Sequence, residues 1–183
     1  MKTALVILAE GFEEIEAVTP IDVLRRAGAE VTVAGVGDGP ITGSRGVTIL
    51  PDAPLAEVAD RDYDVVVLPG GMPGATNLRD EPRMKEILTR TLEKDGVVGA
   101  ICASPAVVLD TLGFLVGKVA TCHPALAEDM KTGNRTEDRV VVDGNIVTSK
   151  GPGTALEFSL ALVRHVFGPA KAHEVNAPMF GKV

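Results

Sequence analysis

One cysteine stands at a point in the sequence where it could act as a nucleophile. Cys102 lies in residues 99–105 (GAICASP), between an apolar run and a segment with helical spacing. Its small neighbours Ala100 and Ser104 allow the tight strand-to-helix bend that presents the serine in GxSxG hydrolases. The N–H groups and dipole of the following helix favour a thiolate, so we expect a thiol pKa below its ordinary value of about 8.5. The pattern indicates a nucleophile, although cysteine is also a common buried structural residue.

A carboxylic acid in the first predicted helix is the second candidate. At 100° per residue, Glu16 falls between Val23 and Ala27 on the apolar arc of a helix predicted over residues 14–27. A carboxylate on a buried face is costly to ionise, so its pKa should rise, and the protonated acid can donate a hydrogen bond to a thiolate. We therefore expect Glu16 to be the protonated partner of Cys102. The alternative is a solvated residue in a frayed first turn.

Backbone N–H groups could complete such a site. Gly70 and Gly71 follow an apolar run, and the N–H groups of Gly71 and Ala103 could form an oxyanion hole facing Cys102. A simple tight turn is the alternative for the two glycines. His123 could act as a general base or an orienting donor, or could be an ordinary surface residue. Neither a phosphate-binding fingerprint nor metal-ligand spacing of cysteine, histidine and glutamate occurs, so we expect no bound metal.

These candidates follow predicted strands, which places them at one edge of a sheet. Several runs are apolar without alternation, as in parallel strands covered by helices on both faces. Their alternation with helical segments predicts a right-handed, doubly wound α/β sheet, in which ligands bind outside the carboxyl ends of the strands. A further strand end, residues 151–154 (GPGT), opens the last long helix. We predict strands at 4–9, 31–36, 64–68, 97–101 and 145–148, helices at 14–27, 82–95, 103–112 and 155–167, and hairpin or edge pieces at 47–50 and 139–142.

The composition limits the class of protein. Acidic side chains outnumber basic ones by 25 to 18 and the basic residues are scattered, so nucleic acid is not expected as a primary partner. Four glutamates follow or interrupt the first apolar run, which predicts neither a signal peptide nor a membrane span. Two cysteines without CxxC spacing fit neither a disulfide framework nor a structural zinc. We expect a single domain over residues 1–183, in a reducing compartment such as the cytoplasm.

Four segments together resemble the ThiJ/PfpI superfamily, specifically its Parkinson-disease-associated deglycase branch. They are GAICASP, LPGG, EGFEEIEAVTPIDVLRRAG and TSKGPGTALEF, and the resemblance runs from residue 4 to about residue 178. It implies a flavodoxin-like fold with a mostly parallel sheet, a homodimer and no required cofactor. It also implies residue roles: Cys102 matches the reactive cysteine, Glu16 its protonated partner, Gly71 and Ala103 the backbone donors, His123 a histidine near the pocket, and Arg45 an arginine near the pocket and dimer interface.

The resemblance implies a cysteine-dependent glyoxalase or deglycase that acts on methylglyoxal or on glycated adducts and serves in oxidative or carbonyl stress. Redox sensing and chaperone activity through oxidation of Cys102 form an alternative, because a reactive thiolate is also an oxidation target. Peptidase-like members of the superfamily carry a histidine directly after the cysteine, whereas Ala103 occupies that position here. An amidase or peptidase is therefore disfavoured, since a cysteine without an adjacent base suits a reactive aldehyde better than a stable amide.

Overall fold

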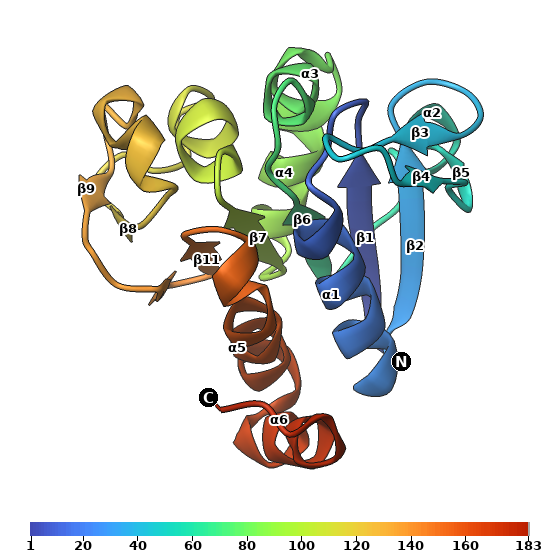
Figure 1. Ribbon diagram of the computed structural model, residues 1–183, viewed down its shortest axis with the longest axis vertical. Coiled ribbons are helices and arrows are strands. Elements are labelled where there is room, and N and C mark those ends of the chain that lie inside the picture. Colours follow the sequence, from blue (N-terminus) through green and yellow to red (C-terminus); the bar gives the residue numbers. More distant parts are fainter. Residues whose placement is uncertain (183) are drawn as a thin grey trace.

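The predicted strands form one seven-stranded sheet in this computed structural model, which describes residues 1–182 (Figure 1). The strand order from edge to edge is β10-β11-β7-β6-β1-β2-β5. All neighbouring strands are parallel except β10 and β11, which form an antiparallel edge hairpin. The predicted doubly wound, mostly parallel sheet is confirmed. The strands are β1 Thr3–Leu8, β2 Glu30–Gly35, β5 Ala53–Pro54, β6 Val65–Leu68, β7 Val97–Ile101, β10 Val140–Asp143 and β11 Ile146–Ser149.

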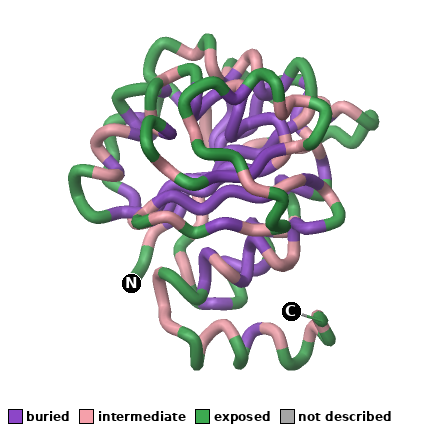
Figure 2. The backbone as a smooth tube through the Cα atoms, turned by 90° about the vertical axis from the view of Figure 1, so that its left-hand side faces the viewer, coloured by how far each residue is buried: buried purple, intermediate pink, exposed green. Residues whose placement is uncertain are grey.

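Helices cover both faces of this sheet. The helices α1 and α5 contact each other on one face, and α6 packs against α5, while α3 and α4 lie on the opposite face (Figure 1). Figure 2 shows the consequence, a buried layer of strands between partly exposed helices and loops. The sequence did not predict the short helices α2, α3 and α6. The helices are α1 Glu14–Arg26, α2 Leu55–Val58, α3 Gly74–Asp80, α4 Met84–Glu93, α5 Ala155–Phe167 and α6 Pro169–Asn176.

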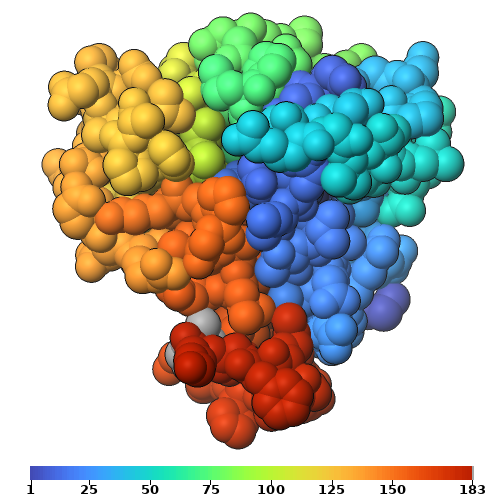
Figure 3. Space-filling model, viewed as in Figure 1, coloured from blue at the N-terminus to red at the C-terminus, as the bar shows by residue number. Residues whose placement is uncertain are grey.

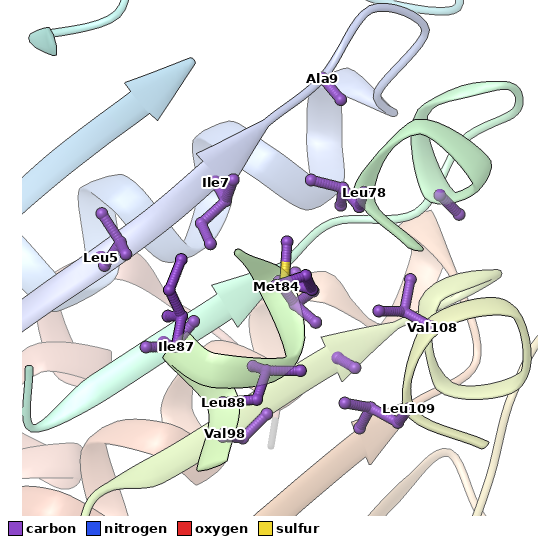
Figure 4. Close-up of a cluster of buried hydrophobic side chains, with 14 of the residues drawn as sticks. Leu5, Ile7, Ala9, Leu78, Met84, Ile87, Leu88, Val98, Val108 and Leu109 are labelled. Carbon is purple, nitrogen blue, oxygen red and sulfur yellow. The ribbon is translucent and has the colours of Figure 1, made fainter. Parts of the chain in front are cut away.

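Alternate residues of the central strand β1 enter two separate hydrophobic clusters. Leu5 and Ile7 pack in the cluster that contains Met84, Ile87 and Leu88 of α4 (Figure 4). The intervening residues of β1 face the other cluster, to which α1 and α5 contribute. All of these side chains are at most 2% exposed. Burial on both sides explains why the central strands are apolar without alternation.

A small hairpin lies over the beginning of α1. It pairs β3 (Ile41–Thr42) with β4 (Thr48–Ile49), which confirms the predicted hairpin piece at 47–50. The N–H of Gly11 donates to the carbonyl of Thr42, and the N–H of Ser44 donates to that of Phe12. Figure 3 shows this hairpin, in cyan, across the top of the blue α1 segment. The β3–β4 hairpin therefore fixes the loop that follows β1 by hydrogen bonds at Gly11 and Phe12.

The segment after β7 differs from its prediction. A ten-residue helix was expected at 103–112, but the structure has a six-residue π-type helix, η1, at Pro105–Asp110. Proline cannot donate a backbone N–H, and the wider π-type bonding often occurs in short segments beside functional sites. Hydrogen bonds of the α-helical type flank this segment, from the N–H of Val107 to the carbonyl of Ala103 and from the N–H of Leu112 to that of Val108. The predicted helix over residues 103–112 is therefore present, and its central turns have π-type bonding.

The strand order reverses direction between β1 and β6. The chain passes from β1 to β2 and β5 on one side, then returns to place β6 on the other side of β1. In doubly wound sheets, the carboxyl ends of the strands at such a reversal form the ligand-binding crevice. The segments after β1, β6 and β7 therefore meet at the expected place for a site.

The segment that contains His123 is anchored by one carboxylate. Asp110, which is 5% exposed, accepts hydrogen bonds from the N–H groups of Lys131, Thr132 and Gly133 and from the Thr132 hydroxyl. Burial alone would raise the pKa of Asp110, but these hydrogen bonds lower it. The two-stranded pair of β8 (Val119–Ala120) and β9 (Asn134–Arg135) closes the same region. Among residues 1–182, no helix has the length and apolar character required to cross a bilayer.

Candidate active site

Cys102 occupies a strained corner directly after β7. Its φ angle is 64°, in the left-handed region that a residue with a Cβ rarely adopts. The corner is held by two backbone hydrogen bonds: the N–H of Cys102 donates to Ser149 at 2.9 Å, and its carbonyl accepts from His123 at 2.8 Å. This conformation, at the exit of a buried strand, is that of a nucleophile elbow. It turns the sulfur out of the sheet while leaving it half-buried.

Glu16 lies opposite, on the first turn of α1, and is completely buried. Its Oε2 accepts a hydrogen bond of 2.8 Å from the N–H of Gly70, but Oε1 is buried without a hydrogen-bond partner. The alternative of a solvated, frayed turn is therefore wrong. The turn is fixed because the Glu13 carboxylate accepts the N–H of Glu16 at 2.8 Å and so caps the helix.

Burial raises the pKa of Glu16 to about 7, against hydrogen bonds from Cys102 and Gly70 that lower it. The negative charge of Glu13 raises the pKa of Glu16 further. The predicted upward direction of this pKa is confirmed. Its physical cause is the loss of hydration of a carboxylate inside an apolar helix-sheet interface.

The predicted low thiol pKa is wrong for the resting pocket. Burial raises the pKa of Cys102 to about 12, and the charge and hydrogen bonding of Glu16 act in the same direction. The N–H groups of Gly71 and Ala103 lower this pKa, but by less than burial and Glu16 together raise it. The sequence suggested a helix whose N–H groups and dipole would favour a thiolate, but burial of the thiol and the neighbouring Glu16 outweigh them.

Cys102 and Glu16 therefore act as one acid-base pair. A negative charge on either group raises the cost of ionising the other, so the first proton is lost by the pair as a unit and one negative charge is shared between the carboxyl and the thiol. Moving the thiol proton to Glu16 produces a thiolate beside a neutral acid without changing the charge of the pair. The pair can thus present the predicted form, a thiolate with a protonated glutamate, as the product of an internal proton transfer.

Two glycines allow the pair to meet. A Cβ on Gly70 would lie 2.7 Å from the Cβ of Cys102 and 2.8 Å from Oε2 of Glu16. Gly71 has φ +88°, and a Cβ there would lie 2.5 Å from the N of Glu13. Neither position accepts a side chain without displacement of its neighbours. The N–H groups of Gly71 and Ala103 lower the pKa of the Cys102 thiol, and their role as donors to a reacting oxygen stays a prediction.

His123 lies at the rim of the same pocket. The backbone N–H of His123 donates to the carbonyl of Cys102. The ring Nδ1 of His123 accepts a hydrogen bond of 3.2 Å from the N–H of Ala125. In this arrangement the ring proton is on Nε2. The ring edge lies beside Gly151, where a Cβ would be 3.6 Å from Cδ2 of His123. The structure therefore places His123 with the pair, and leaves Nε2 as its free hydrogen-bonding atom.

Arg45 is placed differently from the other predicted residues. It lies on the exposed β3–β4 hairpin, where its backbone N–H donates to Oε1 of Glu14 at 2.6 Å. Within residues 1–182, its guanidinium forms no ion pair. The contact fixes the hairpin to α1, and does not bring the Arg45 charge to the sulfur of this chain.

Three supporting residues were not assigned roles from the sequence. Glu13 caps α1 and its N–H donates to the carbonyl of Gly70 at 2.9 Å. The Ser104 hydroxyl donates to the carbonyl of Pro69 at 2.6 Å, which joins the end of β6 to the elbow. Gly151 follows β11 and closes the far side of the pocket. The sequence indicated Ser104 only as a small neighbour that permits the bend and Gly151 only as part of the strand end at 151–154, and it gave no role to Glu13.

A cysteine elbow on a doubly wound sheet, facing a buried glutamate across a double-glycine turn, defines a cysteine-dependent protein of the flavodoxin-like α/β class. The chain belongs to the DJ-1/PfpI family, whose model matches residues 2–165. The resemblance to the ThiJ/PfpI superfamily is thereby confirmed.

Named relatives match over almost their whole length. The chain is 46% identical to "Parkinson disease protein 7 homolog" of Danio rerio, over 99% of this chain and 98% of that protein. It is 38% identical to "Glutathione-independent glyoxalase DJR-1.2" of Caenorhabditis elegans, over 97% of this chain and 96% of that protein. Among solved structures, "Toxoplasma gondii DJ-1, oxidized" is similar with a TM-score of 0.96 and 41% identity, covering 100% of both chains.

Proposed function

We propose that this protein is a cysteine-dependent, glutathione-independent glyoxalase or deglycase that acts on methylglyoxal or on glycated adducts. The observation that carries the proposal is the pairing of Cys102, on its elbow, with the buried carboxyl of Glu16. The glyoxalase name of the Caenorhabditis elegans relative supports the same activity. The physiological setting in oxidative or carbonyl stress is part of this proposal.

The first step forms a bond between sulfur and carbon. The Glu16 carboxylate takes the thiol proton, and the Cys102 thiolate adds to the aldehyde carbon of methylglyoxal. The carbonyl electron pair moves to oxygen, and the N–H groups of Gly71 and Ala103 stabilise the oxyanion. Protonation of that oxygen gives a hemithioacetal.

The second step is an internal oxidation and reduction, so it needs no external electron acceptor. A base removes the hydrogen on the former aldehyde carbon as a proton, and a proton is returned to the neighbouring ketone carbon through an enediol. This leaves a thioester of lactate on Cys102, which water hydrolyses to lactate and free thiol. We assign the role of proton carrier to Glu16, because it is paired with Cys102, and Nε2 of His123 is the second candidate.

The test is lactate formation from methylglyoxal by the purified protein, without glutathione and with a chelator present. We expect turnover by the wild type and none by Cys102→Ser. Cys122→Ser is the control, because Cys122 is the other free thiol and is fully buried away from solvent. Lactate formation by Cys102→Ser at the wild-type rate would rule the proposal out.

Redox sensing, with chaperone behaviour, is the second candidate function. One observation favours it: Cys102 is half-buried and reachable, whereas Cys122 is 0% exposed. Oxidation of Cys102 to a sulfinate would add two oxygen atoms. Intact-mass analysis after mild peroxide, beside turnover assays, separates the two functions. Addition of two oxygens at Cys102 together with negligible turnover would favour the sensor.

We also propose a homodimer formed through α1 and the β3–β4 hairpin. Four apolar side chains are exposed there, Ile15 and Val18 on α1 and Val47 and Leu50 on the hairpin. Exposure of 54% for Ile15 and 74% for Leu50 is high for an apolar surface that would face water alone. Arg45 lies on the same hairpin, in keeping with an interface role.

Sedimentation velocity tests this assembly. We expect a species of twice the chain mass of 19.1 kDa, and a shift to the chain mass when Val47 and Leu50 are both replaced by Asp. A wild type that sediments at the chain mass at micromolar concentration would contradict the dimer. The two free thiols support a reducing compartment, such as the cytoplasm, as the proposed location.

A further inference from the structure

Gly151 lacks a side chain at a position where the backbone does not require glycine. Its φ and ψ angles are 166° and −168°, an extended conformation that any residue can adopt. It is buried, directly after β11. Gly71 differs, because its φ of +88° strains any residue with a Cβ. The backbone therefore does not explain why residue 151 is glycine, so we consider the space that a side chain there would occupy.

That space has the size of a methyl group and lies inside the pocket. A Cβ on Gly151 would be 3.6 Å from Cδ2 of His123 and 3.9 Å from Oε1 of Glu16, with no other atom within 4 Å beyond its immediate chain neighbours. Both distances are ordinary van der Waals contacts. The Oε1 atom on this side is the buried oxygen of Glu16 that has no hydrogen-bond partner. An unpaired buried polar atom beside an unfilled space is a strong indication of a bound group.

Hydrogen bonds hold the backbone of Gly151, which borders this space, in place. The N–H of Gly151 donates to the hydroxyl oxygen of Thr154 at 3.1 Å, and the N–H of Thr154 donates back to the carbonyl of Gly151 at 2.9 Å. The Thr154 hydroxyl also lies 2.6 Å from that of Ser149, whose carbonyl accepts the N–H of Cys102. Gly151 is thus tied to the elbow through a short chain of hydrogen bonds.

We propose that the space between Gly151, His123 and Oε1 of Glu16 is the subsite for the methyl group that an α-oxoaldehyde carries on the ketone carbon, next to the aldehyde carbon that Cys102 attacks. Gly151 is then a specificity-determining residue that admits an α-oxoaldehyde with a methyl-sized substituent, and the inference rests on the proposed function. When the oxyanion points to the N–H groups of Gly71 and Ala103, the substituent must lie on another side of the carbon. The open side is the one that Gly151 leaves free.

Gly151→Ala tests this assignment by filling the subsite with one methyl group. Glyoxal and methylglyoxal differ by the same methyl group, and their acids, glycolate and lactate, are measured without glutathione. We expect Gly151→Ala to lower the ratio of kcat/KM for methylglyoxal to that for glyoxal by about tenfold, as one methyl group too many does in a fitted pocket. Gly153→Ala is the matched control, because a Cβ on Gly153 meets nothing within 4 Å. An unchanged ratio in Gly151→Ala, or an equal fall in Gly153→Ala, overturns the subsite.

A second measurement separates failure of the subsite from failure of the proposed reaction. Chloroacetaldehyde and chloroacetone differ by one methyl group on the carbonyl carbon next to the carbon that Cys102 attacks, and alkylation is followed at Cys102 by peptide mass. We expect Gly151→Ala to slow the methylated reagent more than the unmethylated one, relative to wild type. If this holds while the wild type turns over neither aldehyde, the subsite stands and the glyoxalase proposal fails. If both reagents slow equally, the subsite is wrong even when the wild type is active.

Discussion

Replacement of Glu16 by glutamine is expected to lower methylglyoxal turnover about a thousandfold, which is the usual size of a general acid-base contribution. Glutamine can accept the hydrogen bond from the N–H of Gly70, so the pocket keeps its shape. It cannot take the proton of Cys102 or return one to the substrate. A variant with turnover within threefold of wild type would contradict the assigned role.

The pH dependence of Cys102 alkylation identifies the same proton. In the wild type the reactive form appears when the Cys102–Glu16 pair loses its first proton, so the alkylation rate should rise with one midpoint that belongs to the pair, near the Glu16 pKa of about 7. In Glu16→Gln that midpoint should disappear, and the rate should keep rising beyond about pH 8.5, the ordinary pKa of a thiol. A midpoint near 7 that survives the substitution would assign the titration to another group.

The same variant should be more stable than the wild type at pH 8. A carboxyl pKa raised from 4.5 to about 7 means that the folded protein resists ionisation of Glu16, so stability present below pH 4.5 is lost as the pH rises through 7. This loss amounts to about 3 kcal/mol at pH 8, and glutamine avoids it. Urea unfolding at pH 8 and at pH 4 measures the difference, which should vanish at pH 4.

Glu14→Gln is the control with the opposite sign. Burial alone would raise the pKa of Glu14, but hydrogen bonds from the N–H groups of Arg45 and Val47 lower it, so ionised Glu14 stabilises the fold. That stability is present above the ordinary pKa of 4.5 and is lost as the pH falls. Glutamine at position 14 should therefore destabilise the protein at pH 8. Gains in stability from both substitutions would contradict the assignment of buried charge to Glu16.

Gly70→Ala is expected to separate the two reacting groups and remove activity. The added Cβ would lie 2.7 Å from the Cβ of Cys102, 2.8 Å from Oε2 of Glu16 and 2.9 Å from the N of Ala103. The first and third neighbours belong to the elbow, so it must shift. We expect a loss of stability of about 2 to 3 kcal/mol, typical of overpacking in a well-packed interior, and loss of lactate formation.

The effect of Gly70→Ala is steric, because Gly70 does not have a left-handed φ. Gly153→Ala again serves as the control, since it adds the same methyl group in open space. Thermal unfolding and lactate formation should both change for position 70 and for neither at position 153. Wild-type activity in Gly70→Ala would show that the close contact of the pair is not needed.

The sequence predicted the sheet well because its strands are buried on both faces. Residues of β1 and β6 are apolar without alternation, a pattern that arises in parallel sheets. The strands of two residues, such as β3 and β5, are held by tertiary contacts and have no periodicity of their own. The short helix α3 follows Pro73 and was likewise not predicted, because seven residues give too few turns for a recognisable apolar stripe.

The site was predictable in position but not in its electrostatics. Strand ends and the wheel of α1 located Cys102 and Glu16, since the topology brings carboxyl ends of parallel strands together. The thiol pKa depends first on burial in the assembled fold and then on the charge of Glu16, 86 residues away in sequence, so local spacing could not give its direction. The role proposed for Gly151 depends on the space left by the Cβ that glycine lacks, and no sequence pattern indicates such a space.

The reversal of strand order between β1 and β6 means that reactivity is a property of the whole assembled chain. Glu16, the Gly70–Gly71 turn and Cys102 come from separate β-α units that are far apart in the sequence. In a partly unfolded chain, or in any fragment that lacks β1, Cys102 would be an ordinary surface thiol without its proton acceptor. A cell could therefore not obtain this chemistry from a truncated or incompletely translated product, however intact the cysteine segment itself.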